Sequence, residues 1–353
     1  MGNRNYIIDL LRFLAALSVA LFHFNESIPY TDNWYRNLIK IGYLGVPVFF
    51  VISGYCILLT ASRSKNASDF LIKRLFRIMP AYWFSLLIVL FVVIIQTLIT
   101  GYNSITLLPK DIISISAVLT LLTDPFTSIP TINWVYWSLT YELFFYFVVT
   151  FSLFFSKSFT LPFLIFISLL SLIIPSESNG PLFFLYHWPT FALGLGVYLL
   201  YHKQDSKHWT FCILIFAITL ISLTKTFLLS GQITYVAAAL IGALLIVLSH
   251  HIKLNNNLFS KLGDYSYAIY LIHVPIGVYL IGALKTQDIQ KKILLNILFD
   301  LLTYAIVFSI SFLIFKYIES PFIQKGKLIS KKYFFNPKNS KQALKLEIDT
   351  IPH

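Results

Sequence analysis

Two ionisable side chains, Arg12 and His23, lie in an apolar stretch, 6–24, that is long enough to cross a membrane. A charged or titratable group at bilayer depth costs roughly 2.5–3.5 kcal/mol on insertion scales, so each is a candidate for function. Eleven residues at about 100° each return to within about 20° of the start, so both side chains share one helix face. Because they are about 16 Å apart along the axis, they can line one passage but cannot act on the same atom.

Histidine suits general-base chemistry, because its ordinary pKa of about 6.5 lets it exchange a proton near neutral pH. Structural alternatives exist for both residues. Arg12 can pair with Asp9, three residues earlier, or extend to the membrane interface, and His23 can hydrogen-bond within a helix bundle. The spacing alone leaves these interpretations open.

Other apolar stretches also carry polar candidates. Glu142, in WSLTYELFFYF (137–147), is either a structural acid satisfied by Tyr141 and Tyr146 or a carboxylate that orients a histidine. His273, in YAIYLIHVPI, is either a packed structural histidine or a partner of the site. Asp300 is an intramembrane acid to which the sequence assigns no role.

The stretch 69–83, DFLIKRLFRIMPAYW, alternates apolar and basic residues in an interfacial, amphipathic pattern. It can anchor the chain to anionic lipid headgroups. Alternatively, Arg74 and Arg77, three residues apart on one face, can clamp a phosphate-bearing ligand.

Small residues recur in the stretch 42–57, GYLGVPVFFVISGYCI. Gly42, Gly45, Ser53 and Gly54 would let helices approach closely, which is the simpler interpretation. The same residues can also shape a cavity beside the first span.

The composition predicts an all-α, polytopic membrane protein. Hydrophobic residues make up 57% of the chain and charged residues 12%, and the mean hydropathy is +0.76. We expect one membrane domain, 1–324, whose last span ends near Glu319 and Pro321, and a polar, disordered tail, 325–353. About ten spans are predicted, at 6–24, 38–60, 81–100, 137–155, 160–176, 183–201, 208–224, 232–249, 264–283 and 293–316. The interrupted segment 107–123 is expected to be interfacial or re-entrant.

The basic residues predict the orientation. Most of the 27 Lys and Arg residues fall in segments on the side of the N-terminus, so both termini are predicted to be cytoplasmic. The net charge of +12 follows this topology rule, which argues against nucleic-acid binding. Cys56 and Cys212 both fall within spans, so neither a disulfide nor a metal site is indicated.

Taken in order, these motifs resemble the membrane-bound acyltransferase-3 family over residues 9 to about 322. One departure is Phe13, where members commonly have a small glycine after the arginine, and the larger ring is expected to narrow the passage beside Arg12. The matching elements are Asp9-Leu-Leu-Arg12 with His23, Gly45-Val-Pro-Val-Phe-Phe-Val-Ile-Ser53-Gly54, Arg74-Leu-Phe-Arg77-Ile-Met-Pro80-Ala-Tyr82, Trp137-Ser-Leu-Thr-Tyr-Glu142, Tyr267-Ala-Ile-Tyr270-Leu-Ile-His273 and Ile318-Glu319-Ser-Pro321.

The resemblance implies a multi-pass enzyme of the bacterial cytoplasmic membrane that carries an acyl group, usually acetyl, from cytosolic acyl-CoA to an extracytoplasmic carbohydrate. It implies acetyl-CoA as donor substrate, with no permanently bound cofactor and no metal. O-antigen, exopolysaccharide and lipid-linked glycans are the expected acceptors. The implied roles are catalysis for His23 and Glu142, a donor path at Arg12, CoA phosphate contacts for Arg74 and Arg77, and positions at or beside the substrate site for Asp9, Ser53 and His273.

Two other classes of protein would also place charges inside helices. A transporter or flippase of a lipid-linked sugar is the alternative function, but it would not need a cytosolic arginine clamp together with a single critical histidine. A polysaccharide polymerase would be expected to present a large catalytic outer loop. The longest outer segment, 101–136, has only Lys110, Asp111 and Asp124 as charges.

Overall fold

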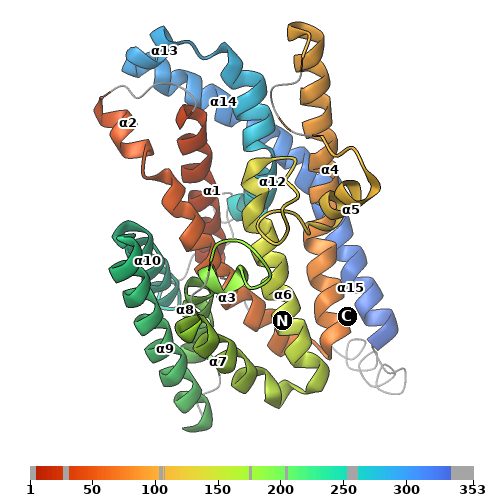
Figure 1. Cartoon of the computed structure of the whole chain (residues 1–353), viewed down its shortest axis with the longest axis vertical. Coiled ribbons are helices and arrows are strands. Elements are labelled where there is room, and N and C mark those ends of the chain that lie inside the picture. Colours follow the sequence, from red (N-terminus) through yellow and green to blue (C-terminus); the bar gives the residue numbers. More distant parts are fainter. Residues whose placement is uncertain are drawn as a thin grey trace, which may run out of the picture.

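The computed structural model describes residues 5–26, 32–102, 106, 108–174, 177–202, 206–252 and 261–334. Every regular element in these ranges is helical (Figure 1), which confirms the predicted all-α class. The α-helices are α1 (Tyr6–Glu26), α2 (Trp34–Ile39), α3 (Gly45–Arg63), α4 (Ala67–Thr100), α5 (Ile112–Thr120), α6 (Trp137–Phe155), α7 (Lys157–Ile173), α8 (Phe184–Tyr201), α9 (Ser206–Ser230), α10 (Ile233–Ser249), α12 (Ser266–Ile272), α13 (Gln287–Lys291), α14 (Ile293–Ile314) and α15 (Ser320–Phe334).

Shorter elements join these helices. The 3₁₀ turns are η1 (Gly42–Leu44), η2 (Trp134–Tyr136), η3 (Leu262–Tyr265) and η5 (Gly282–Leu284). Two π-helical segments, η4 (His273–Ile281) and η6 (Phe315–Glu319), continue α12 and α14.

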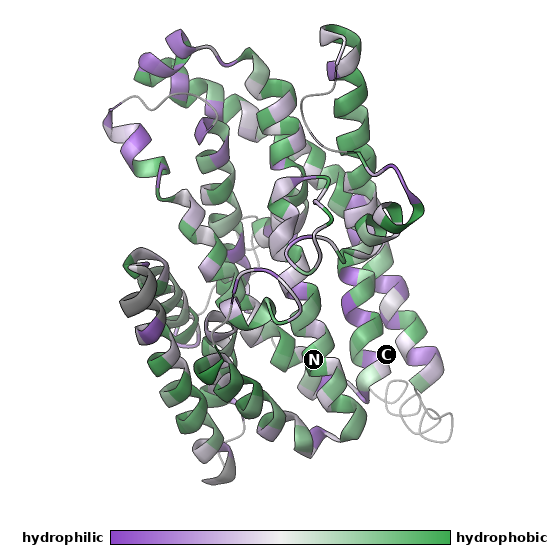
Figure 2. Cartoon of the chain, in the orientation of Figure 1, coloured by the Kyte–Doolittle hydropathy of each residue, from purple (hydrophilic) through white to green (hydrophobic). Residues whose placement is uncertain are grey.

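Among the described residues, seven helical runs are long and apolar enough to cross a membrane. Two shorter apolar helices, α7 and α10, accompany them. The multi-pass architecture is therefore confirmed, whereas the count of ten spans and the side of the termini stay predictions. Hydrophilic residues gather on α2 and α13 at one end and on α15 and the neighbouring part of α4 toward the other (Figure 2).

Helix α8 is buried along nearly its whole length and packs against α3 and α9. Its contact with α3 is made by two glycines. A Cβ at Gly54 would lie 2.0 Å from the Phe191 carbonyl oxygen, and one at Gly194 would lie 1.9 Å from that of Val51. The close-packing interpretation of the small residues in 42–57 is therefore confirmed for Gly54.

Helix α4 differs from the prediction. Its 34 residues span about 51 Å, well beyond a hydrocarbon core of about 30 Å. The amphipathic stretch 69–83 and the predicted span 81–100 are thus parts of one continuous helix. The segment 107–123, expected to be interfacial or re-entrant, contains α5, which is too short to span a membrane.

The prediction that the last helix ends near Glu319 and Pro321 is wrong, because α14 runs through η6 into α15. Pro321 lies within this continuous helical run, directly after the π-helical segment η6. Residues 325–334 of the expected disordered tail are therefore helical. They pack along the start of α4, where Ser330 donates to Asp69, while 335–353 lie outside the described residues.

Candidate active site

A pocket lies between α1, α3, α4, α6 and α12. Five residues singled out in the sequence contribute to its wall, although they are far apart along the chain. They are Arg12, Ser53, Arg74, Arg77 and Glu142. The fold therefore brings the predicted donor-path and clamp residues into one site.

Glycines hold α1 against its neighbours and so fix where its polar side chains lie. A Cβ at Gly42 would lie 2.1 Å from the Ser18 carbonyl oxygen, and one at Gly45 would lie 2.6 Å from that of Ala15. At the start of α1, a Cβ at Gly263 would lie 2.1 Å from the Asp9 carbonyl oxygen. Any larger residue at these positions would push α1 away from α3 or η3.

Arg12 both pairs with Asp9 and lines the pocket, so the structural and the functional interpretation are compatible. Its guanidinium lies 3.2 Å from Asp9 Oδ1, so the predicted ion pair forms. Arg12 also lines the pocket. Asp9 thus lies beside the pocket and holds the arginine at its wall.

The two arginines of α4 differ in how they are held. The buried Arg74 donates to the Cys56 carbonyl oxygen and to Thr60 Oγ1, and its guanidinium lies 5.4 Å from the centre of the Tyr146 ring. Arg77 lines the same pocket but has no hydrogen-bond or ion-pair partner within the described part of the chain. Arg74 is therefore anchored to α3, while the guanidinium of Arg77 is the one available to an anion.

Glu142 is satisfied by hydroxyl groups. Tyr146 donates to its carboxylate at 2.7 Å and Ser53 at 3.3 Å, whereas Tyr141 donates instead to the Ser178 carbonyl oxygen. No described histidine contacts Glu142, so the structure favours the alternative of an acid satisfied by hydroxyl groups, while a catalytic role for Glu142 stays a prediction. Glu142 and Ser53 instead form a polar wall of the pocket.

The carboxylate that contacts His23 is Glu26. His23 Nδ1 lies 2.8 Å from Glu26 Oε2, which is three residues further along α1. Because Nδ1–H donates a hydrogen bond to this carboxylate, the neutral ring carries its proton at Nδ1, so Nε2 keeps its lone pair and can act as a base. Sequence reasoning missed Glu26 because it lies just beyond the predicted span, although the i,i+3 spacing was visible.

Two rings pack on His23. The Trp134 ring lies 4.4 Å away and nearly perpendicular, and the His273 ring lies 5.4 Å away and nearly parallel. His273 is fully buried, its Nδ1 lies 2.7 Å from the Tyr270 carbonyl oxygen, and its Nε2 has no partner among the described residues. It begins the π-helix η4, a rare element that is frequent at functional sites.

Tyr270 connects the pocket to the two histidines. Its side chain lines the pocket, and its ring lies 5.5 Å from that of His273. The Tyr270 hydroxyl is hydrogen-bonded to Ser138 Oγ and to the Val135 carbonyl oxygen. His23 and His273 therefore do not line the pocket themselves, and the rings of Tyr270 and His273 lie between the pocket and His23.

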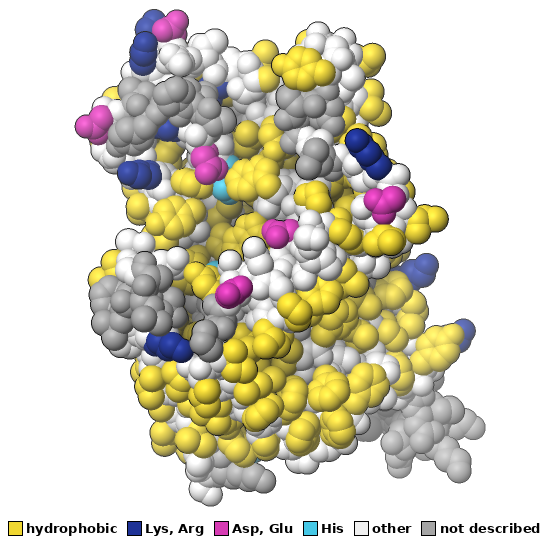
Figure 3. All heavy atoms as spheres, in the orientation of Figure 1, with side chains coloured by type: hydrophobic (Ala, Val, Ile, Leu, Met, Phe, Trp, Pro, Cys, Tyr) yellow, Lys and Arg dark blue, Asp and Glu magenta, His cyan; other side chains and the backbone are white. Residues whose placement is uncertain are grey.

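The face of the molecule drawn in Figure 3 is hollowed, and histidine and carboxylate side chains are visible in the hollow or at its rim. Glu26 is 49% exposed at its side chain, whereas His23 is 9% exposed. The histidine side chain is therefore almost covered, while about half of its carboxylate partner is exposed at the surface of the molecule. Within the described ranges, no group of three or more His, Cys, Asp or Glu residues is placed to hold a metal ion.

Comparison with known proteins identifies the family. The family model for the acyltransferase-3 type, described as an acyltransferase domain, matches residues 5–316. The chain belongs to the acyltransferase-3 family. It is accordingly a multi-pass membrane acyltransferase.

A curated relative of this acyltransferase-3 protein is nodulation protein 10 of Rhizobium leguminosarum bv. viciae, which is 33% identical over 109 residues. The match spans 30% of this chain and 28% of the relative, less than two thirds of either. No solved structure matches the chain.

Proposed function

We propose that this acyltransferase moves an acyl group, acetyl by preference, from cytosolic acyl-CoA to a hydroxyl of an extracytoplasmic carbohydrate. The observation that carries the proposal is the continuity of the site. A pocket whose wall holds three arginines is joined, by the packed rings of Tyr270 and His273, to a histidine that a carboxylate orients.

The arginine end of the pocket suits the nucleotide of the donor. Coenzyme A carries several phosphate charges, and guanidinium groups bind phosphate with paired, charge-assisted hydrogen bonds. Arg77 has its guanidinium free of described partners, and Arg74 is fixed beside it. With the nucleotide at these residues, the pantetheine arm would extend past Arg12 toward Tyr270.

The orientation of the chain supports this placement. The basic start of α4 and the lysine-bearing α15 pack together at the end of the molecule that carries Arg74 and Arg77 (Figure 1). Basic residues concentrate on the cytoplasmic side of membrane proteins. Arg77 would therefore face the cytosol and His23 the exterior, in the cytoplasmic membrane of a bacterium.

The chemistry needs a base on the acceptor side. His23 Nε2 would take the proton from the acceptor hydroxyl as its oxygen attacks the thioester carbonyl carbon. The carbon–sulfur bond then breaks, and the leaving thiolate takes up the proton from His23. Glu26 would stabilise the positive charge that His23 carries between these two steps.

The acceptors that suit an outward-facing His23 are surface carbohydrates, among which we propose O-antigen, exopolysaccharide and lipid-linked glycans. Carboxylates near the hollow offer acceptors for sugar hydroxyl groups. The acyl chain is proposed to be short because the Tyr270 ring separates the pocket from His273 and His23.

The test is transfer of label from acetyl-CoA to cell-envelope glycan in membranes from cells with and without the protein. We expect transfer by the intact protein and none by His23→Ala at matched expression. His251→Ala is the control, because His251 is exposed and contacts Tyr201, away from the site. Absence of transfer from any acyl donor would refute the proposed activity, and equal transfer by His23→Ala would remove His23 from the chemistry.

A further inference from the structure

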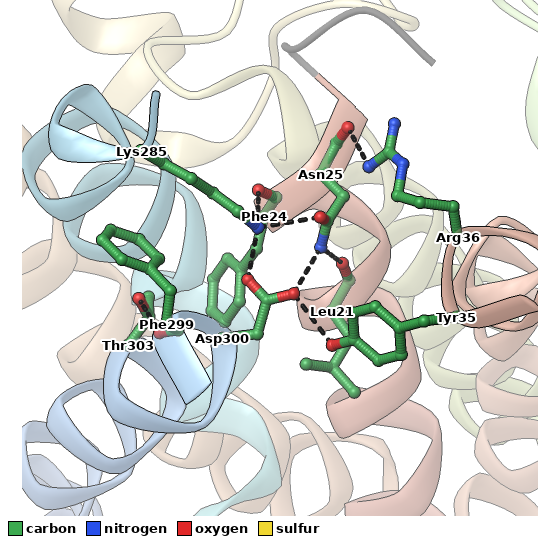
Figure 4. A network of polar contacts seen from close by, with 9 residues as sticks. All are labelled: Leu21, Phe24, Asn25, Tyr35, Arg36, Lys285, Phe299, Asp300 and Thr303. Atoms are coloured by element: carbon green, nitrogen blue, oxygen red, sulfur yellow. Dashed lines mark hydrogen bonds and ion pairs between the residues drawn. The ribbon is translucent and has the colours of Figure 1, made fainter. Parts of the chain in front are cut away.

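A cluster of polar side chains is buried at the end of α1, and it begins at Asn25, two residues after His23. The cluster consists of Asn25, Tyr35, Arg36, Lys285 and Asp300, each less than 9% exposed. These residues come from α1, α2, the segment after η5, and α14 (Figure 4). The cluster gives a structural role to Asp300, the intramembrane acid to which the sequence alone assigned none.

Lys285 and Asp300 form the centre of the cluster. Lys285 Nζ lies 2.5 Å from Asp300 Oδ1, 2.8 Å from Asn25 Oδ1 and 3.3 Å from the Phe24 carbonyl oxygen. The other carboxylate oxygen, Asp300 Oδ2, accepts from Asn25 Nδ2 and from the Tyr35 hydroxyl, both at 2.8 Å. All three N–H groups of the ammonium and both carboxylate oxygens are therefore used.

The same cluster supplies donors to the end of α1. The last carbonyl groups of a helix have no donor within the helix, and cations are favourable there. Arg36 donates to the Asn25 carbonyl oxygen at 2.6 Å, Lys285 to that of Phe24, and the Asn25 side chain to that of Leu21. Distant parts of the chain thus cap the turn that carries His23 and Glu26.

We propose that Lys285, Asp300 and Arg36 are positioning residues for His23, acting through the end of α1. Their role is to hold the last turn in one place, so that the imidazole meets the acceptor and the thioester. This inference rests on the proposed function, since it assigns the purpose of the cluster to the reaction at His23.

A pair of variants separates positioning from stability. Lys285→Met leaves the buried Asp300 carboxylate without its cation, so we expect a lower melting temperature and slower transfer. The double variant Lys285→Met/Asp300→Asn removes both charges, while the new amide oxygen can still accept from Asn25 and Tyr35, so neither an unpaired charge nor an unpaired donor is left buried. The double variant still lacks the donor to the Phe24 carbonyl group.

We therefore expect the double variant to regain the melting temperature but not the rate. The transfer rate at saturating acetyl-CoA should stay about tenfold or more below the wild type, while the KM for acetyl-CoA changes less than about twofold. Recovery of both the melting temperature and the rate would overturn the proposal, because the cluster would then only stabilise the fold.

The matched control is Lys225→Met. Lys225 Nζ donates to the Leu172 carbonyl oxygen, 2.8 Å away, near the end of α7. It performs the same capping chemistry on a helix that does not carry the site. We expect Lys225→Met to leave the transfer rate unchanged, and a loss equal to that of the double variant would also contradict the proposal.

Hydrogen–deuterium exchange gives a readout that does not need the reaction. The peptide covering residues 20–26 should exchange faster in the double variant than in the wild type, whereas the start of α1 should be unchanged. Unchanged exchange at 20–26 would overturn the capping role. If the wild type shows no transfer, the exchange result still tests the cap, so failure of the proposed function and failure of this inference are distinguishable.

Discussion

Replacing Gly277 by alanine should displace His23 without touching it. A Cβ at Gly277 would lie 2.1 Å from Phe24 Cε1 and 2.8 Å from Cζ. Ordinary contact begins at 3.4 Å, so the ring must retreat by the difference, about 1.3 Å. Phe24 is 3% exposed and directly follows His23 in the last turn of α1, so we expect part of this displacement to reach His23.

The size of the effect follows from two known costs. Overpacking a well-packed site costs about 1–3 kcal/mol of stability. A displacement of about 1 Å at a reacting group costs about 10²-fold in rate. We therefore expect Gly277→Ala to lower the melting temperature modestly and the transfer of label from acetyl-CoA to envelope glycan by about a hundredfold.

Two companion variants make the result specific. Gly242→Ala is the control, because its Cβ would lie 3.4 Å from the nearest atom of Val48, which is ordinary contact. Phe24→Leu combined with Gly277→Ala removes part of the ring and should recover some of the lost rate. Wild-type transfer by Gly277→Ala, or no improvement in the combined variant, would refute the proposed link between Phe24 and His23.

Three further predictions concern the pocket and the bundle. Glu26→Gln should lower kcat by about thirtyfold with little change in the KM for acetyl-CoA. Glu26 Oε2 lies 2.8 Å from His23 Nδ1, but the carboxylate is half exposed, so solvent screening reduces its stabilisation of an imidazolium to about 2 kcal/mol. An unchanged kcat would exclude Glu26 from the reaction. Arg77→Gln should raise the KM for acetyl-CoA about tenfold or more at an unchanged melting temperature, since a charge-assisted hydrogen bond contributes about 1.5–3 kcal/mol. Arg74→Gln should lower both donor affinity and melting temperature, because Arg74 also anchors α4 to α3. Identical behaviour of the two variants would contradict the different roles assigned to the two arginines. Gly194→Ala should abolish the close contact of α8 with α3, so we expect the variant to elute as aggregate in size-exclusion chromatography. A normal melting temperature would show instead that the two helices can adapt to the added Cβ.

Much of the site could be predicted because its chemistry is local in sequence. The face shared by Arg12 and His23 follows from helical geometry alone, and α1 confirms that they lie on one helix. The three-residue spacing of Arg74 and Arg77 likewise placed both on one face, and both line the pocket. Charged residues in apolar stretches are rare, so each was visible as a candidate.

The remaining features depend on contacts that no local pattern records. Lys285 and Asp300 each meet Asn25 from more than 250 residues away, so their roles emerge only when the helices pack. The choice between the two alternatives for Glu142 depends on packing in the same way, since Tyr146 and Ser53 are the residues that donate to it.

Helix boundaries were also hard to predict. A hydropathy window cannot distinguish where a span ends from where a helix ends. The sequence-based prediction therefore divided α4 into two segments and ended the α14–η6–α15 run too early. A proline usually indicates an end, but the helical run continues through Pro321, directly after the π-helical segment η6.

The most direct test of the account asks whether the pocket receives the donor. The sequence has two cysteines, of which Cys56 lines the pocket and Cys212 is buried on α9, where its sulfur faces the Gly196 carbonyl oxygen. In Cys212→Ser, alkylation of Cys56 by a small maleimide therefore reports on the pocket alone. We predict that acetyl-CoA slows this alkylation in a saturable manner and that Arg77→Gln shifts the protection to higher acetyl-CoA concentrations. Alkylation at the same rate with and without saturating acetyl-CoA would contradict the placement of the donor in this pocket.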